Sequence, residues 1–354
     1  MTTTPTYKSL SRLVYLAAFL FLAIWFTAQI ISVIILVFFA IVITIVLNAP
    51  VTWLQRKKMS RTAAGLLVFI CMLVLFGLVG WMLIPKIVTQ LKLLIIQMPQ
   101  YLEKLSQHIT SWIGDHGMDN TNLLPSTSSF ANQATGILNN IGRYSMGLIR
   151  NIFMTIFFFC LVGYMLTNPR PLLEMYLSLF PEDKKEKAVE AFSKASVMTI
   201  GWMWSNILAG TLRATIVWIF LYFMGIPGLW VWAGVTFFAE LIPKIGFYIM
   251  AVPPVLVAFT ISPMTALWVA LFLIALDEVI GDFILPRLRS STMKIHPVST
   301  LVMLLAMTAA FGVMGAFIAT PLVAFIKAFY ETFYQKKHPP EITNKYIDAM
   351  LFRQ

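Results

Sequence analysis

Six ionisable side chains stand inside long apolar stretches of this 354-residue chain. Each costs about 2.5–3.5 kcal/mol to place at membrane depth on insertion scales, so such residues commonly bind a solute or an ion. The alternative for each is a position at the membrane interface. The six candidates are Arg213, Glu240, Lys244, Asp277, Glu278 and Asp282.

The first candidate group lies on one face of the apolar stretch 199–224. Trp202, Asn206, Gly210 and Arg213 follow one another at steps of four, four and three, which is helical spacing. We expect Arg213 to face a conduit, where it pairs with a carboxylate or binds an anion. The alternative is an arginine that extends to the membrane interface.

The second group contains Glu240 and Lys244, which are four residues apart in F-F-A-E-L-I-P-K-I-G. This order suits an ion pair on a helix. Pro243 and Gly246 favour a break there, and a broken helix flanked by charges is a common solute or ion site. The alternative is a helix end at the cytoplasmic interface.

The third group is acidic and lies in A-L-D-E-V-I-G-D-F-I-L-P-R, which ends with Pro286 and Arg287. Glu278 and Asp282 are predicted to share a helix face. Clustered carboxylates repel one another and so favour a proton or a cation between them, which suits proton or cation exchange. The alternative is a cluster ion-paired with Arg287 and Arg289.

A fourth motif is structural. In A-A-F-G-V-M-G-A-F-I-A-T-P, small residues recur four apart, a spacing that lets helices pack closely. The predicted packing residues are Gly312, Gly315, Ala316, Ala319 and Pro321.

The composition identifies the elements that must position these groups. Apolar residues make up 59% of the chain and charged residues 12%, against about 45–50% and 25% in soluble domains. The chain is therefore predicted to be an all-α, polytopic integral membrane protein in contact with a lipid bilayer. The net charge of +11 sits in short clusters between apolar runs, which favours membrane topology rather than nucleic-acid binding.

About eight transmembrane segments are expected. Region 1–85 would hold an N-terminal tail and three spans: a hairpin over 13–47 turning near Gln29 and Ser32 and ending at Asn48-Ala49-Pro50, then 62–84 ending at Pro85. Region 86–146 carries an apolar stripe at helical spacing and is predicted to be an extracytoplasmic amphipathic helical region. This stripe would either pack on the membrane part or join subunits of a homo-oligomer.

The remaining regions are 147–200, 201–334 and 335–354. The first would hold a fourth span over 147–167 and a surface helix starting at Pro181, and the last a cytoplasmic tail. Between them lies the transport core, with a fifth span over 199–224. Apolar runs at 246–260, 298–311 and 313–328 are too short for ordinary spans, so broken or re-entrant helices are expected.

The basic residues predict the topology. Lysines and arginines cluster at 8–12, 56–61, 170–194, 287–294 and 327–353. All five clusters fall on one side if the first two spans form a hairpin, and the positive-inside rule makes that side the cytoplasm. We therefore expect a multi-pass protein of a bacterial inner membrane with both termini cytoplasmic.

Motifs of enzymes and metal sites are absent from the sequence. It has no H-E-x-x-H, G-x-S-x-G or P-loop, and its four histidines are scattered. Both cysteines, Cys71 and Cys160, lie inside apolar runs. The sequence therefore predicts neither an enzyme, nor a cofactor, nor coupling to ATP hydrolysis.

The C-terminal half resembles the autoinducer-2 exporter family of bacterial permeases. The resemblance is carried by M-G-I-P-G-L-W, E-L-I-P-K-I-G-F-Y-I-M-A-V-P-P, D-E-V-I-G-D-F-I-L-P, I-H-P-V-S-T-L-V and F-G-V-M-G-A-F-I-A-T-P-L-V-A-F. It implies seven to eight spans and transport without ATP. Some family members are linked to export of a small furanosyl signalling molecule, and others to exchange of sodium or lithium for protons.

Three functions follow as hypotheses. The first is export of a small polar solute without ATP hydrolysis, along a path lined by Asn206, Arg213 and the break at Pro243. The second is sodium or lithium/proton antiport, with Asp277, Glu278 or Asp282 as the ion ligand. The third is a membrane-anchored interaction protein that transports nothing.

Overall fold

The computed structural model describes residues 7–113, 145–242, 245–289 and 296–334, and all regular secondary structure in these ranges is helical. Within these ranges, four helices are long and apolar enough to cross a membrane, and a bent pair of helices provides a fifth candidate. The prediction of an all-α, polytopic membrane protein is confirmed, whereas the number of eight spans stays a prediction.

The first element, α1, is one helix over Tyr7–Arg56. The hairpin predicted for 13–47 is therefore wrong, as is the end predicted at Asn48-Ala49-Pro50. No glycine or proline occurs between residues 13 and 47, so the polar side chains of Gln29 and Ser32 alone do not break the helix. The hairpin was the basis for placing the cluster 8–12 beside the other basic clusters, and the location of the N-terminus stays a prediction.

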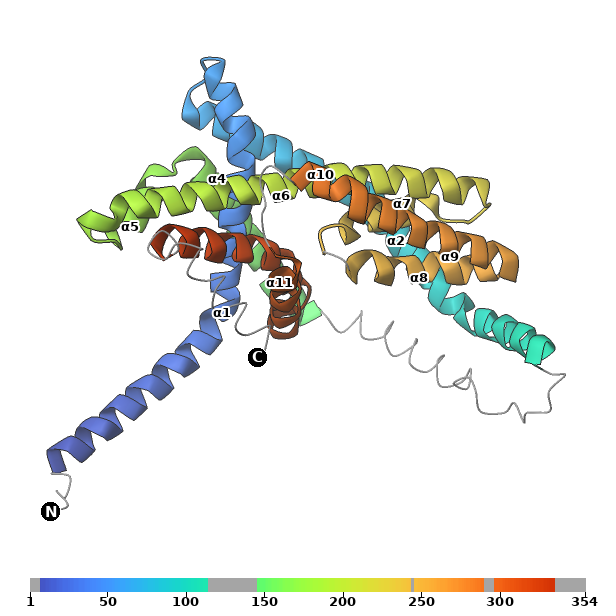
Figure 1. Ribbon diagram of the computed structural model, residues 1–354, viewed down its shortest axis with the longest axis horizontal. Helices are drawn as coiled ribbons and strands as arrows, with labels where there is room; N and C mark the ends of the chain where they lie inside the picture. The colour runs from blue at the N-terminus through green and yellow to red at the C-terminus, as the bar shows by residue number, and fades with distance from the viewer. Residues whose placement is uncertain (1–6, 114–144, 243–244, 290–295, 335–354) are drawn as a thin grey trace, which may run out of the picture.

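The second element, α2, spans Arg61–Ile113 and continues through Pro85 into the predicted amphipathic region. The expected end of the third span at Pro85 is therefore wrong. One helix joins the membrane-crossing part to the helical part of 86–113, and Figure 1 shows its far end extending beyond the neighbouring helices. Residues 114–144 of the predicted extracytoplasmic region lie outside the described residues.

The next three elements are α4 (Ser145–Thr167), α5 (Arg170–Ser178) and α6 (Glu182–Phe223). Helix α4 matches the predicted fourth span, and α5 follows it after a bend of 90°. Helix α6 merges the predicted surface helix with the predicted fifth span, because no glycine or proline interrupts residues 182–200. Pro181 is its N-cap, and Glu182 and Asp183 occupy the first turn, where acidic residues favour the helix dipole.

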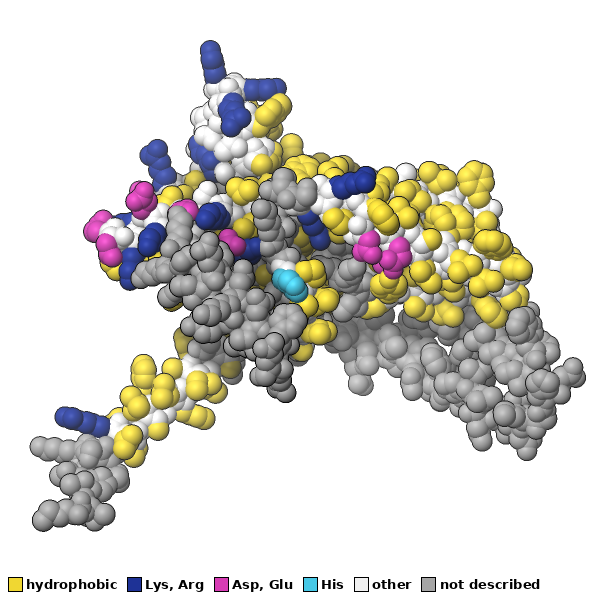
Figure 2. All heavy atoms as spheres, viewed as in Figure 1, with side chains coloured by type: hydrophobic (Ala, Val, Ile, Leu, Met, Phe, Trp, Pro, Cys, Tyr) yellow, Lys and Arg dark blue, Asp and Glu magenta, His cyan; other side chains and the backbone are white. Residues whose placement is uncertain are grey.

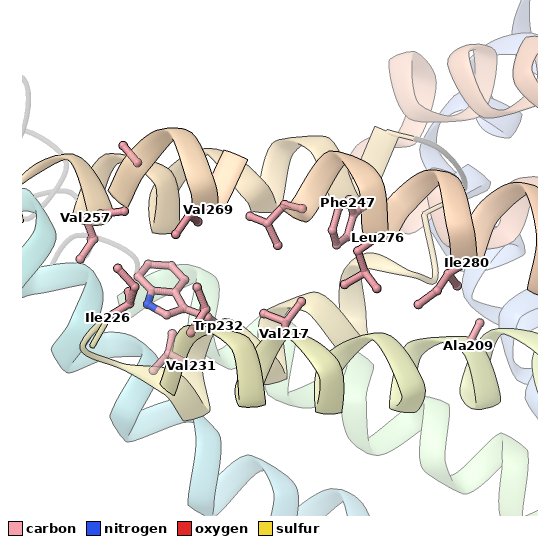
Figure 3. Packing of buried hydrophobic residues seen from close by; sticks show 14 residues of the cluster. Ala209, Val217, Ile226, Val231, Trp232, Phe247, Val257, Val269, Leu276 and Ile280 are labelled. Atoms are coloured by element: carbon pink, nitrogen blue, oxygen red, sulfur yellow. The ribbon is translucent and has the colours of Figure 1, made fainter. Parts of the chain in front are cut away.

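The elements that follow lie beside α6 (Figure 1). They are α7 (Leu229–Ala239), α8 (Ile245–Phe259), α9 (Pro263–Glu278), the π-helix η2 (Val279–Ile284) and α10 (Leu285–Arg289). Helix α7 packs directly on α6, and α8 packs on α9. Their buried side chains form the largest core cluster of the described residues. In Figure 3, Val217 of α6 faces Leu276 of α9, and Phe247 of α8 lies beside them.

The last element, α11 (Pro297–Phe333), contains a break at Gly312, whose φ of 61° and ψ of −144° are not helical. The predicted short runs 298–311 and 313–328 are its two arms, so the broken helix expected here is confirmed. A Cβ on Gly315 would lie 1.9 Å from the Met307 carbonyl oxygen, so the arms touch. Ala316 and Ala319 of the second arm pack against Leu304 of the first, and Pro321 is buried in the second arm.

Gly312 and Gly315 have different roles in this contact. A Cβ on Gly312 would meet no described atom within 4 Å, so this glycine supplies the positive φ that an L-residue rarely adopts. Gly315 instead supplies the space for a neighbouring backbone.

Apolar side chains cover most of the visible face over α6 to α9, whereas charged side chains gather where α5 meets α6 (Figure 2). Large exposed residues such as Trp81, Phe223 and Trp268 are 77%, 77% and 58% exposed. A surface this apolar fits a lipid environment rather than water.

Replacing Gly315 with alanine is expected to destabilise the fold, because the added methyl group would overlap the Met307 backbone. Overpacking of this kind costs about 1–3 kcal/mol. The thermal unfolding midpoint of the purified protein in detergent would fall. The control is Gly77→Ala in α2, where the methyl group meets nothing within 4 Å; equal midpoints for the two variants would contradict the close contact.

Candidate transport site

Arg213 lies at the centre of the site, on α6, and is only 3% exposed. Its Nη1 atom is 2.8 Å from Asp277 Oδ1 on α9 and 3.1 Å from Glu240 Oε2 at the end of α7. Both carboxylates are buried as well. One guanidinium nitrogen therefore holds together three elements that are far apart in the sequence.

An aromatic residue of α8, Phe247, also contacts this ion pair. The Arg213 guanidinium carbon lies 4.4 Å from the centroid of the Phe247 ring, a cation–π contact that contributes about 2 kcal/mol where it is desolvated. Helix α8 thus places an aromatic ring against the buried cation.

A second arginine approaches the same face of α6 from α10. Arg289 Nε donates to the Ser205 hydroxyl at 3.3 Å, and Arg289 Nη2 donates to the Asn206 side-chain oxygen. Arg289 also acts electrostatically on Glu240. Two arginines and two carboxylates, Glu240 and Asp277, therefore form a neutral group, which reduces the large cost of burying each charge alone.

Two glycines allow the helices to approach closely enough for these contacts. A Cβ on Gly210 would lie 3.1 Å from the Phe237 carbonyl oxygen and 3.3 Å from Glu240 Cβ, so α6 and the end of α7 are nearly in contact one turn before Arg213. A Cβ on Gly246 would lie 2.1 Å from the Ala239 carbonyl oxygen. The chain therefore folds back tightly between α7 and α8, which brings both Glu240 and Phe247 to Arg213.

The π-helix η2 explains how α9 and α10 reach α6 together. Pro286 is exposed on α10 and has no amide hydrogen, and the preceding Leu285 amide bonds to the Ile280 carbonyl in a wide, five-residue turn. Wide turns of this kind often occur at functional sites. Here the turn lies between Asp277, which bonds Arg213, and Arg289, which bonds Asn206.

The site also contains three buried hydrogen-bond donors on α6. Trp202 Nε1, Asn206 Nδ2 and Arg213 Nε have no hydrogen-bond partner among the described residues, although these three side chains are at most 3% exposed. They share one face of α6 and extend over about 16 Å at 1.5 Å per residue. Buried donors are normally satisfied, so this row is suited to accept the oxygen atoms of a polar solute.

The predicted site residues separate into groups. Asn206, Arg213, Glu240 and Asp277 come together, with Gly246 beside them, whereas Glu278 and Asp282 are exposed. Acidic side chains interrupt the apolar face near α9 (Figure 2). Glu240 pairs with Arg213, while Pro243 and Lys244 lie outside the described residues.

Sequence reasoning missed Ser205 and Phe247. It considered Arg289 only as an ion-pair partner for the acidic cluster of its own segment, whereas Arg289 also bonds to Ser205 and Asn206 of α6. No group of three or more His, Cys, Asp or Glu residues in the described ranges could hold a metal ion.

Comparison with known proteins agrees with a membrane transport protein. The family model described as "AI-2E family transporter" matches residues 13–335. The chain therefore belongs to the AI-2E transporter family, as the sequence motifs predicted.

Curated relatives carry transport names. "Putative transport protein YueF" of Bacillus subtilis (strain 168) is 22% identical over 79% of this chain and 79% of its own length. "Putative transport protein YrrI" of the same organism is 26% identical over 82% and 85%. "Putative transport protein YhhT" of Escherichia coli (strain K12) is 24% identical over 85% of both chains.

Replacing Arg213 with methionine is expected to destabilise the protein strongly, because Glu240 and Asp277 would remain buried without their cation. Breaking a buried pair in this way costs about 3–5 kcal/mol. The thermal unfolding midpoint in detergent measures the loss, and the triple variant Arg213→Met/Glu240→Gln/Asp277→Asn should recover most of it.

The matched control is Lys194→Met, which breaks a surface pair with Glu190 at 3.0 Å and should cost less than about 1 kcal/mol. Equal destabilisation by Arg213→Met and Lys194→Met would show that the buried cluster contributes no more to the free energy of unfolding than the surface pair.

Proposed function

We propose that the protein moves a small polar solute out of the cell, without ATP hydrolysis, along the face of α6 that carries Trp202, Asn206 and Arg213. The observation that supports this proposal is the row of buried donors that have no partner among the described residues, beside the ion cluster of Arg213, Glu240 and Asp277. A solute rich in hydroxyl and ether oxygens, such as a furanosyl signalling molecule, offers acceptors for these donors.

The ion cluster supplies the complementary chemistry. Glu240 Oε2 makes a charge contact with Arg213 without hydrogen-bond alignment, so it retains acceptor capacity for a solute hydroxyl. A site with donors along α6 and carboxylate acceptors at its end suits a neutral molecule with several hydroxyl groups better than a simple anion. Discrimination against apolar molecules follows, because they would leave the buried polar groups unpaired.

The energy source, the membrane location and the oligomeric state are also part of what we propose. The sequence has no P-loop, so the solute's own gradient or an ion gradient would drive transport. We place the protein in the inner membrane of a bacterial cell with both termini in the cytoplasm, and we expect homo-oligomers through α2. Membership in a family of transporters favours transport over a purely anchoring role.

The transport proposal is tested by a pair of tryptophan variants on α6. Trp202→Phe removes a buried donor, whereas Trp204→Phe changes a side chain that is 46% exposed on the same helix. In sealed liposomes loaded with a labelled furanosyl compound, Trp202→Phe and Asn206→Leu should each slow efflux by up to about tenfold, the value of one hydrogen bond.

Trp204→Phe should transport at the rate of the unaltered protein. If Trp202→Phe and Asn206→Leu keep full transport while their unfolding midpoints are unchanged, the path does not follow this face of α6.

Cation/proton antiport is the second candidate, favoured by the exposed carboxylates of Glu278 and Asp282 next to Asp277. An antiporter in liposomes with an internal pH-sensitive dye should move protons when sodium or lithium is added outside. Glu278→Gln or Asp282→Asn should then abolish this movement, because an amide carries no negative charge for the ion.

The control is Glu174→Gln, an exposed carboxylate on α5. Proton movement that survives in Asp277→Asn, Glu278→Gln and Asp282→Asn alike would exclude these carboxylates as the coupling site. No cation-dependent proton movement in the unaltered protein would exclude antiport altogether.

A further inference from the structure

A groove of about 550 Å³ lies between the charged end of α6 and the C-terminal end of α11, away from the ion cluster. Its walls are mainly aromatic: Phe180 and Phe333 stack with ring centroids 6.0 Å apart, and Phe329 stacks on Phe333 at 5.9 Å. Two lysines of α6, Lys184 and Lys187, complete it. No acidic residue is among the described residues that line it.

The lysines of this segment differ in their pairing. Lys185 pairs with Glu182, and Lys194 pairs with Glu190. Lys184 and Lys187, which line the groove, make no ion pair within the described part of the chain. The groove therefore presents two uncompensated positive charges beside an apolar wall, while its neighbours on the helix are neutralised.

The position of the groove relates it to the membrane. Helices α6 and α11 are both candidate spans, and the groove lies where the charged first turns of α6 meet the aromatic end of α11. The tyrosines at its edge, Tyr330 and Tyr334, are 61% and 64% exposed. Exposed tyrosines and lysines beside apolar walls are typical of the level of lipid headgroups.

We propose that this groove binds one anionic phospholipid, with its phosphate held by Lys184 and Lys187 and the beginning of its acyl chains against Phe180, Phe329 and Phe333. The charge pattern selects an anionic headgroup, because each lysine near a membrane surface strengthens attraction to anionic lipid about fivefold. The aromatic wall selects a lipid rather than a free phosphate, which has no apolar part to bury. This inference does not depend on the transported substrate.

The test uses the purified full chain in a neutral detergent, titrated with phosphatidylglycerol or with phosphatidylcholine of the same acyl chains. Native mass spectrometry counts the retained lipid. Lys184→Gln/Lys187→Gln should weaken phosphatidylglycerol retention about thirtyfold, since two lysines are lost. The matched control, Lys185→Gln/Lys194→Gln, has the same net charge and should retain this lipid as the unaltered protein does.

Phosphatidylcholine should bind weakly and equally to all three proteins, and inorganic phosphate should not displace phosphatidylglycerol. Equal loss in both double variants would overturn the proposal by showing that net charge alone attracts the lipid. Displacement by inorganic phosphate would also overturn it, in favour of a free anion. Unchanged unfolding midpoints in both variants ensure that the comparison concerns binding.

Discussion

The charge of Arg213 is the constraint on which the membrane core of this protein depends. A guanidinium cannot lose its proton in a protein, so an arginine that is 3% exposed on an apolar helix must bring carboxylates to itself. Asp277 and Glu240 come from α9 and from the end of α7. The packing of three elements therefore follows from one cation, and the close approach at Gly210 and Gly246 makes that packing sterically feasible.

The sequence predicted only some of the positions at which the helices break. Glycine and proline predicted breaks at 243–246 and at 312. The first agrees with the end of α7 and the start of α8, and the second with the interruption of α11. Two kinds of error occurred. Polar residues such as Gln29 and Ser32 were taken to interrupt a helix, and single prolines such as Pro50 and Pro85 were taken to end one. A proline inside a long apolar helix removes one backbone bond, and its neighbours can compensate.

The candidate site was predictable as a set of residues but not as an arrangement. Helical spacing placed Trp202, Asn206 and Arg213 on one face, and the cost of charge at depth singled out Glu240 and Asp277. Spacing cannot say which of the three carboxylates turns inward, because that depends on how α9 packs against α6 and α8. Asp277 is buried, whereas Glu278 and Asp282 are exposed. The contact of Arg289 with Asn206 joins residues 83 positions apart, and nothing local in the sequence encodes it.

The ion cluster is divided between two pairs of helices, α6 with α7 and α8 with α9. Helix α6 packs extensively on α7, and α8 packs extensively on α9, whereas α6 and α9 touch at few points. Arg213 and Glu240 therefore belong to one pair of helices, and Asp277 belongs to the other. A shift of α8 and α9 against α6 would separate Asp277 from Arg213 but leave Glu240 in place, so the buried guanidinium would keep one carboxylate throughout. If the two pairs of helices moved against each other in this way, a cation shared by two carboxylates would keep one of them, which a single ion pair could not do.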